Sequence, residues 1–235
     1  GEIEKLQVSL KGPGDFVTVS DKKVEKILID ELQKARPNYS ILSEEIGEIK
    51  NDQSFKWIID PIDGTANFLH GIPHFAISIG LEHNKEIICG IIYDPIKDEM
   101  FTAEKGKGSY LNNQRMRVSS RTKLNDCIIF SGGPRYKSEN KELIFQEYKK
   151  FSSKVTTAIR KLGSASLDMA YVAAGRCDGF WQRDLNYWDI AAGIVLVKEA
   201  GGFVTDFKGE NEYIKNKTIL VANSKINKEM IEVLK

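Results

Sequence analysis

The sequence predicts an α/β protein of the α+β, layered kind. Strand-like runs come in groups and are interrupted by single helices, whereas a strict βαβ protein would alternate them. The chain has 235 residues, of which 41% are hydrophobic and 29% are charged, as in ordinary globular proteins. No repeat, linker or low-complexity tract divides it. We therefore expect one domain over residues 1–235, with two lobes that meet near residue 155.

The first half of the chain is expected to form one helix and then a set of strands. DKKVEKILIDELQKARP has apolar residues at helical spacing, with Asp21 as the expected N-cap and Pro37 ending the helix. YSILSEE and FKWIID have the composition of short strands. FAISIGLEH, EIICGIIYDP and EMFTAE follow with turn residues between them, which predicts an antiparallel meander.

The second half mixes helices and strands more closely. Helices are expected at KELIFQEYKKF, GSASLDMAYVAAG and the terminal NKEMIEVLK, and strands at TTAIR, DGFWQ and TILVA. YWDIAAGIVLVKEAGG is apolar on nearly every side, which indicates a mostly buried helix that ends at Gly201 and Gly202.

Charge and cysteine content exclude some classes of partner. The net charge of +1 comes from 34 basic and 33 acidic residues spread along the chain, so we expect no direct nucleic-acid binding. There is no apolar N-terminal signal and no run of transmembrane length, so no membrane association is expected. Three widely spaced cysteines, an odd number, are typical of a reducing cytoplasm.

The segment WIIDPIDGTANF carries the strongest chemical signal. Pro61 lacks a backbone N–H, so we expect the strand to stop at Asp60 and to leave Asp60 and Asp63 near one strand end. Gly64 permits close backbone approach, and Thr65 can begin a short helix whose free amides point at whatever the carboxylates hold. Such a site suits a metal-bound phosphate. The alternative is that the segment is only a polar turn.

More acidic residues are needed to decide between these interpretations. Glu44 and Glu45 end the strand YSILS, and Asp189 comes early in the helix that begins near Trp188. Oxygen ligands from several element ends are what Mg²⁺ accepts, whereas His and Cys pairs at zinc spacing are missing from the sequence.

Two histidines four residues apart form the other conspicuous pattern. His70 and His74 have Gly71 and Pro73 between them, which rules out a shared helix face. We expect both to be structural or loop residues.

These motifs as a set resemble the inositol monophosphatase family, a group of Mg²⁺-dependent, lithium-sensitive phosphatases. WIIDPIDGTANF, the upstream LSEE and the downstream YWDIAAGIVLVKEAGG carry the resemblance, which runs from about Lys11 to the C-terminus. GPGDFVTVSDKKVE and GSASLDMAYVAAGRCDGFW most resemble the bacterial branch of inositol-1-monophosphatases and extragenic suppressor proteins. The resemblance implies an α-β-α-β-α sandwich of the sugar-phosphatase (inositol monophosphatase/fructose bisphosphatase) type, a dimer, and a helix preceding residue 1.

The resemblance also implies two or three Mg²⁺ ions and their ligands. Glu44, Asp60 and the backbone carbonyl of Ile62 would hold the first metal. Asp60, Asp63 and Asp189 would hold the second, with Asp60 as the bridge. A third, weaker cation is expected near Glu44.

Further residues are expected to act on the water and the phosphate. Thr65, bonded to Asp21, would orient the attacking water and relay its proton, and Glu44 would share in this step. For Asp21 the alternative is a simple helix cap, and both roles can hold at once. The amides of Gly64 and Thr65 would bind phosphate, and Asp189 would also contact the substrate.

The alcohol side of the substrate is expected to meet Gly163, Ser164 and Ala165. For Ser164 the alternative is a helix start. Gln182 stands seven residues before Asp189, where the family pattern usually has Glu, so substrate specificity is expected to differ there. We also expect Arg183 to be able to reach a second phosphate.

The expected function is therefore a Mg²⁺-dependent phosphomonoesterase that uses metal-activated water on a small sugar or polyol phosphate, with myo-inositol 1-phosphate as the family default. Phosphatases of fructose 1,6-bisphosphate, NADP, histidinol phosphate or adenosine bisphosphate share the metal motif and remain alternatives. A different class is a protein-binding regulator that contacts RNA polymerase in ribosomal RNA transcription.

Overall fold

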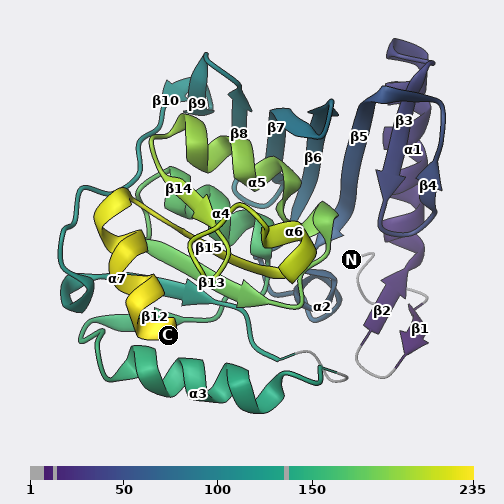
Figure 1. Cartoon of the computed structure of the whole chain (residues 1–235). Coiled ribbons are helices and arrows are strands. Elements are labelled where there is room, and N and C mark those ends of the chain that lie inside the picture. Colours follow the sequence, from purple (N-terminus) through teal and green to yellow (C-terminus); the bar gives the residue numbers. More distant parts are fainter. Residues whose placement is uncertain (1–7, 13–14, 135–137) are drawn as a thin grey trace.

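Two large mixed β-sheets and the helices around them make up the fold (Figure 1). The computed structural model describes residues 8–12, 15–134 and 138–235. One sheet has eight strands in the order β10-β9-β8-β7-β6-β5-β3-β4, and the other has five in the order β12-β11-β13-β15-β14. The α/β fold that the sequence predicts is confirmed.

The eight-stranded sheet is built from the first half of the chain. Its strands are β3 (Tyr39–Ser43), β4 (Gly47–Ile49), β5 (Asp52–Asp63), β6 (Ala76–His83), β7 (Glu86–Asp94), β8 (Glu99–Glu104), β9 (Gly108–Leu111) and β10 (Gln114–Arg115). β3 and β5 run parallel, while β5 to β9 pair antiparallel in sequence order, which confirms the expected meander. A separate hairpin, β1 (Val8–Gly12) and β2 (Asp15–Thr18), precedes it.

The five-stranded sheet comes from the second half. It contains β11 (Ile128–Ser131), β12 (Ala158–Arg160), β13 (Gly179–Arg183), β14 (Phe203–Thr205) and β15 (Thr218–Ala222). β12, β11 and β13 lie parallel to one another. The chain changes from one sheet to the other between Arg115 and Ile128 rather than near residue 155.

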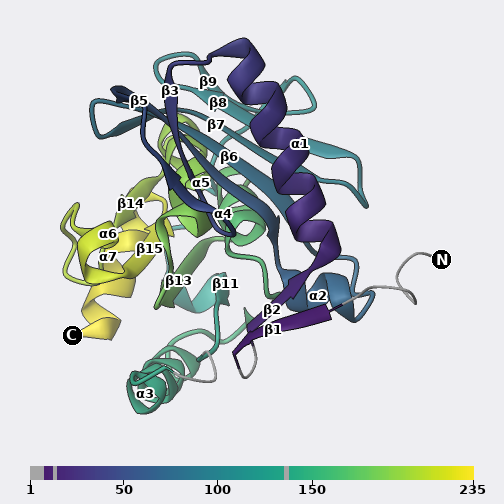
Figure 2. The same cartoon turned by 90° about the vertical axis from the view of Figure 1, so that its right-hand side faces the viewer.

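Helices form three layers that alternate with the two sheets (Figures 1 and 2). α1 (Val19–Ala35) covers β3 and β5 from outside; α4 (Ala165–Ala173) and α5 (Tyr187–Glu199) lie between the sheets; α3 (Lys141–Ser152) and α7 (Ser224–Leu234) cover the other outer face. The remaining helices are short: α2 (Thr65–Leu69), a 3₁₀ turn at Leu124–Asp126 and α6 (Tyr213–Asn216). This order of layers is the predicted α-β-α-β-α sandwich.

The buried helix α5 joins the two sheets into one core. Its residues from Ile190 to Val197 are buried, as the apolar sequence predicts. A β-carbon added at Gly90 of β7 would lie 2.6 Å from the carbonyl oxygen of Ala192, so only glycine lets helix and sheet approach this closely. The main apolar cluster includes side chains from both sheets, among them Ile58 and Val221.

Several boundaries differ from the sequence prediction. α1 begins at Val19, so Asp21 lies in its first turn and is not the N-cap. β5 continues through Pro61 to Asp63 instead of stopping at Asp60. α7 begins at Ser224, and the Asn223 side chain caps it by accepting hydrogen bonds from the backbone N–H groups of Lys225 and Ile226.

Short strands were also missing from the prediction, chiefly β11 and β14, because three or four residues carry too little periodicity to be recognised. The helix expected before residue 1 lies outside the described residues. No helix among those residues is long and apolar enough to cross a membrane.

Candidate active site

Both aspartates of the WIIDPIDGTANF segment lie at the end of β5. Asp60 pairs with Ser78 and Asp63 with Ala76 on β6, and the register shifts between the two pairs. Pro61 therefore sits at a bulge, where its missing N–H costs no ladder hydrogen bond. The backbone N–H of Ile62 turns back and donates to Asp60 Oδ1 at 3.1 Å. This bulge keeps both carboxyl groups at one end of the strand.

Three predicted carboxyl groups surround that of Asp60, which is only 1% exposed. Burial raises the pKa of Asp60 well above its usual value, and the charges of Glu44, Asp63 and Asp189 raise it further, together with a hydrogen bond to Glu44. Each partner comes from a different element. Glu44 directly follows β3, the parallel neighbour of β5, and Asp189 lies in the first turn of α5.

A hard cation fits this chemistry. Like-charged carboxylates that are removed from water need a counter-charge, and oxygen donors from several elements are the ligands that Mg²⁺ accepts. Within the described residues, no group of three or more His, Cys, Asp or Glu side chains is arranged so that it could already hold a metal ion. The electrostatic effects on Asp60 nevertheless place three carboxylates close to it. The residues thus suit a bound Mg²⁺ whose charge would draw them together.

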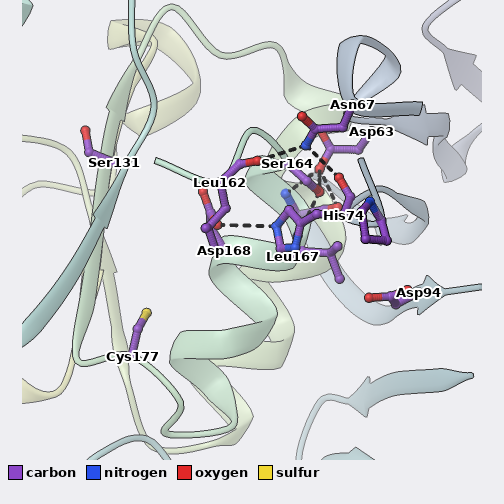
Figure 3. A network of polar contacts seen from close by, with 12 residues as sticks. Asp63, Asn67, His74, Asp94, Ser131, Leu162, Ser164, Leu167, Asp168 and Cys177 are labelled. Carbon is purple, nitrogen blue, oxygen red and sulfur yellow. Dashed lines mark hydrogen bonds and ion pairs between the residues drawn. The ribbon is translucent and has the colours of Figure 1, made fainter. Parts of the chain in front are cut away.

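Asp63 is held in place from α4. Its Oδ2 accepts hydrogen bonds from Ser164 Oγ at 2.6 Å, from Ser166 Oγ at 2.5 Å and from the backbone N–H of Ser166 at 2.7 Å (Figure 3). Ser164 is at the same time the N-cap of α4, which agrees with the helix-start interpretation, while its contact with the substrate alcohol stays a prediction. Ser166 was missed by the sequence analysis. The only signal was its position one residue past the GSA segment.

The turn after Asp63 brings Gly64 and Thr65 beside it. Gly64 has φ +94°, and a β-carbon there would lie 3.2 Å from the carbonyl oxygens of both Gly163 and His74, so only glycine fits. Thr65 Oγ1 lies 3.0 Å from the Ile62 carbonyl oxygen and 3.4 Å from Asp21 Oδ1. The expected contact between Thr65 and Asp21 is therefore present, and Asp21 is fully buried.

A buried glutamate on α1 was also missed. Glu25 Oε1 accepts hydrogen bonds from Ser43 Oγ, from the N–H of Glu45 at 3.0 Å and from the N–H of Ile46 at 3.2 Å. No local pattern indicates this role, because in the sequence Glu25 resembles any charged residue of an amphipathic helix. Its partners lie on both sides of Glu44.

The segment at residues 163–165 runs beside the turn at Gly64. Gly163 has φ +95°, and a β-carbon there would lie 3.0 Å from Asn67 Nδ2. Asn67 Nδ2 itself donates to the carbonyl oxygens of Leu162 at 2.8 Å and His74 at 2.7 Å. Ala165 is buried at the start of α4. The three predicted alcohol contacts thus begin the helix that holds Asp63.

Gln182 and Arg183 point to opposite faces of β13. Gln182 lies on the same face as Phe180, which packs in the core between the sheets, and its amide fills the space left by Gly132. Arg183 lies on the other face, where its Nε donates to Glu147 Oε1 at 2.5 Å and its guanidinium stacks 4.6 Å from the Phe207 ring. Arg183 is thus engaged by Glu147 and Phe207, and its contact with a second phosphate stays a prediction.

The histidines differ in their surroundings. His70 is exposed at the end of α2, as expected of a loop residue. His74 Nε2 lies 3.9 Å from Asp168 Oδ1 of α4, and both atoms are buried without a hydrogen-bond partner among the described residues (Figure 3). Burial raises the pKa of Asp168 to about 6; the nearby Asp63 adds to the rise, and His74 opposes it.

Known proteins match the chain over its whole length. The sequence profile described as "Inositol monophosphatase family" matches residues 2–234. An inositol-1-monophosphatase of Rhizobium meliloti (strain 1021) is 49% identical over 235 residues, which is 100% of this chain and 88% of that protein. The Nus factor SuhB of Escherichia coli (strain K12) is 40% identical over 229 residues, covering 97% of this chain and 85% of that protein.

Solved structures agree with the sequence comparison. The crystal structure of the extragenic suppressor protein suhB from Bartonella henselae has a TM-score of 0.97 and 50% identity, and covers 100% of this chain and 90% of that one. An IMPase structure from Thermotoga maritima has a TM-score of 0.89 and 38% identity, with 97% and 87% covered. The chain belongs to the inositol monophosphatase family.

Proposed function

We propose that the protein is a Mg²⁺-dependent phosphomonoesterase that hydrolyses a small sugar or polyol phosphate, with myo-inositol 1-phosphate as the first candidate. The observation that carries the proposal is the convergence of Glu44, Asp63 and Asp189 on the buried carboxyl of Asp60. Relatives named inositol-1-monophosphatase are 49%, 47% and 43% identical to this chain, which supports the same chemistry here.

The ligand assignment follows the elements that supply each group. Glu44, Asp60 and the carbonyl of Ile62 would hold one Mg²⁺, while Asp60, Asp63 and Asp189 would hold a second. A third ion would bind weakly near Glu44. When bound, Mg²⁺ supplies Lewis-acid activation of water and neutralises charge at the phosphoryl group.

Thr65 would take part in the transfer of the proton from the attacking water. Its hydroxyl carries one hydrogen and has two acceptors, Ile62 O at 3.0 Å and Asp21 Oδ1 at 3.4 Å. When Thr65 donates to Asp21, its oxygen is free to accept a hydrogen bond from water and so to orient it. In this relay, Thr65 Oγ1 would take a proton from the water as the Thr65 hydroxyl proton passes to the buried carboxylate of Asp21, which becomes neutral.

The remaining residues bind the two ends of the substrate. The amides of Gly64 and Thr65 would bind phosphate oxygens, and Gly163, Ser164, Ala165 and Gln182 would line the alcohol side, with Asp189 contacting a substrate hydroxyl. The hydrogen bonds from Ser164 and Ser166 orient Asp63 for this arrangement. Asp63 is thereby preorganised before substrate arrives.

The test is a panel of phosphate esters assayed with Mg²⁺ and with EDTA. It contains myo-inositol 1-phosphate, fructose 1,6-bisphosphate, NADP, histidinol phosphate, adenosine bisphosphate and p-nitrophenyl phosphate. We expect Mg²⁺-dependent release of phosphate, with myo-inositol 1-phosphate hydrolysed efficiently. The Asp60→Asn variant should be inactive, whereas Asp30→Asn, which changes an exposed aspartate on α1, should match the wild type. Equal turnover in EDTA would contradict the proposal.

A second candidate function is contact with RNA polymerase in ribosomal RNA transcription. The observation that favours it is the 39–41% identity to relatives named Nus factor SuhB. Immobilised protein should retain purified RNA polymerase if this function holds. The Asp60→Asn variant separates the two functions, because it should lose hydrolysis and keep such a contact.

The proposal also covers the number of domains, the oligomeric state and the cellular compartment. The continuous core across both sheets supports one domain, and the resemblance to the family supports a cytoplasmic homodimer. Cys89, Cys127 and Cys177 are all free thiols, as suits a reducing compartment. Light scattering should give twice the mass of the chain.

A further inference from the structure

The carboxyl group of Glu25 lies directly behind the turn that carries Glu44. Glu25 is 2% exposed, although it belongs to a helix whose outward side chains are mostly charged and solvated. A buried carboxylate is costly unless hydrogen bonds replace its lost hydration. Glu25 meets this cost with three donors that converge on a single oxygen, Oε1.

The three donors belong to residues immediately before and after Glu44 in the sequence. Ser43, just before it, donates through Oγ, and the backbone amides of Glu45 and Ile46, just after it, donate at 3.0 Å and 3.2 Å. Beyond this turn the chain returns antiparallel as β4. Residues on both sides of Glu44 are therefore fixed to α1, while the N–H of Glu44 itself donates to Ile59 of β5 at 3.2 Å.

The same face of α1 also contacts a second part of the site, at Thr65. Asp21 stands four residues before Glu25, so the two side chains lie one turn apart on one face of the helix. Asp21 contacts Thr65, and Glu25 contacts the Glu44 turn. One rigid helix thus sets the separation between the residue expected to orient water and a predicted metal ligand.

We propose that Glu25 is a positioning residue that holds Glu44 in the orientation needed to bind Mg²⁺. The assignment rests on the proposed function for the identity of the cation and goes beyond it by naming a group that touches neither metal nor substrate. Removing a group that orients a metal ligand through hydrogen bonds typically lowers the metal affinity about 10- to 100-fold.

The test compares matched substitutions on one helix. Glu25→Gln keeps the side-chain shape but turns Oε1 into a neutral and therefore weaker acceptor for its three donors, and Glu31→Gln makes the same change at an exposed position of α1. Mg²⁺ binding to the substrate-free protein is measured by isothermal titration calorimetry, and phosphatase activity is measured as a function of Mg²⁺. Thermal unfolding shows which variants are folded at the assay temperature.

We expect the Mg²⁺ affinity of Glu25→Gln to fall roughly tenfold, with kcat at saturating Mg²⁺ reduced much less, and that of Glu31→Gln to equal the wild type. If Glu25→Gln does not fold, Ser43→Ala removes one donor to Glu25 and should weaken Mg²⁺ binding about threefold. A folded Glu25→Gln, or failing that a folded Ser43→Ala, with wild-type Mg²⁺ affinity would overturn the assignment.

The two proposals fail in different ways. A wild-type protein that binds Mg²⁺ but hydrolyses no ester would refute the proposed function and leave the role of Glu25 to the calorimetric comparison. A wild-type protein that binds no Mg²⁺ would overturn both.

Discussion

Replacing Asp168 by Asn should make the protein more stable at neutral pH and leave it unchanged in acid. Asp168 is 1% exposed, and its Oδ1 has no hydrogen-bond partner among the described residues. The nearest cationic candidate, His74 Nε2, is 3.9 Å away, beyond hydrogen-bond distance. The ionised form of Asp168 is therefore poorly compensated, and asparagine has nearly the same shape without the charge.

The size of the effect follows from the pKa of Asp168. Burial raises this pKa from 3.8 to about 6 in the folded protein. Each unit of pKa corresponds to about 1.4 kcal/mol, so the folded state loses about 3 kcal/mol relative to the unfolded state as the carboxyl ionises. Because the folded pKa is the higher one, this stability is present below pH 4 and is lost as pH rises through 6.

The assay is chemical denaturation of the wild type and Asp168→Asn between pH 4 and pH 8 in EDTA. The difference in unfolding free energy should grow from near zero at pH 4 to about 3 kcal/mol in favour of the variant above pH 7. Asp126→Asn, an exposed control, should show no such growth. A variant that is less stable than the wild type at pH 7.5 would refute the reasoning, since it would mean that Asp168 is ionised and well paired.

Three further predictions concern the site. Ser166→Ala removes a 2.5 Å hydrogen bond to Asp63 Oδ2, so kcat/KM should fall about tenfold in steady-state assays, while an unchanged value would mean that Ser164 and the backbone amide suffice. Gln182→Glu restores the family's charged acceptor and should raise the ratio of kcat/KM for myo-inositol 1-phosphate over p-nitrophenyl phosphate about tenfold; a constant ratio would show that residue 182 does not contact the alcohol. Lithium should inhibit at millimolar concentration by occupying the site of Asp60, Asp63 and Asp189, and a flat lithium titration at limiting Mg²⁺ would exclude this.

Much of the site could be predicted because its residues lie at the ends of recognisable elements. Asp60 and Asp63 end an apolar strand, Glu44 follows a strand, and Asp189 begins a helix. Element ends that share an edge of a sheet meet in space, so the convergence on Asp60 could be anticipated. Gly64 could be predicted too, because a glycine behind an acidic turn indicates a backbone position that excludes side chains.

The supporting residues could not be found this way. Glu25 and Ser166 act across 20 and 103 residues of sequence, and neither has a local pattern that separates it from a solvated helix residue or a helix start. The side of the sheet on which Arg183 lies could not be predicted without the strand register, because successive side chains along a strand point to opposite faces. The missing N–H of Pro61 predicts the end of its strand, but the bulge accommodates this residue within β5.

The most direct test of the proposed function is the Mg²⁺ dependence of hydrolysis in the wild type and in Asp63→Asn. Asparagine can keep the hydrogen bonds from Ser164 and Ser166 but lacks the charge that the second cation needs. The wild type should hydrolyse myo-inositol 1-phosphate only with Mg²⁺, and the folded variant should lose several orders of magnitude in kcat. Near-wild-type turnover by Asp63→Asn would contradict the assignment of the carboxylates around Asp60 as a metal-dependent phosphatase site.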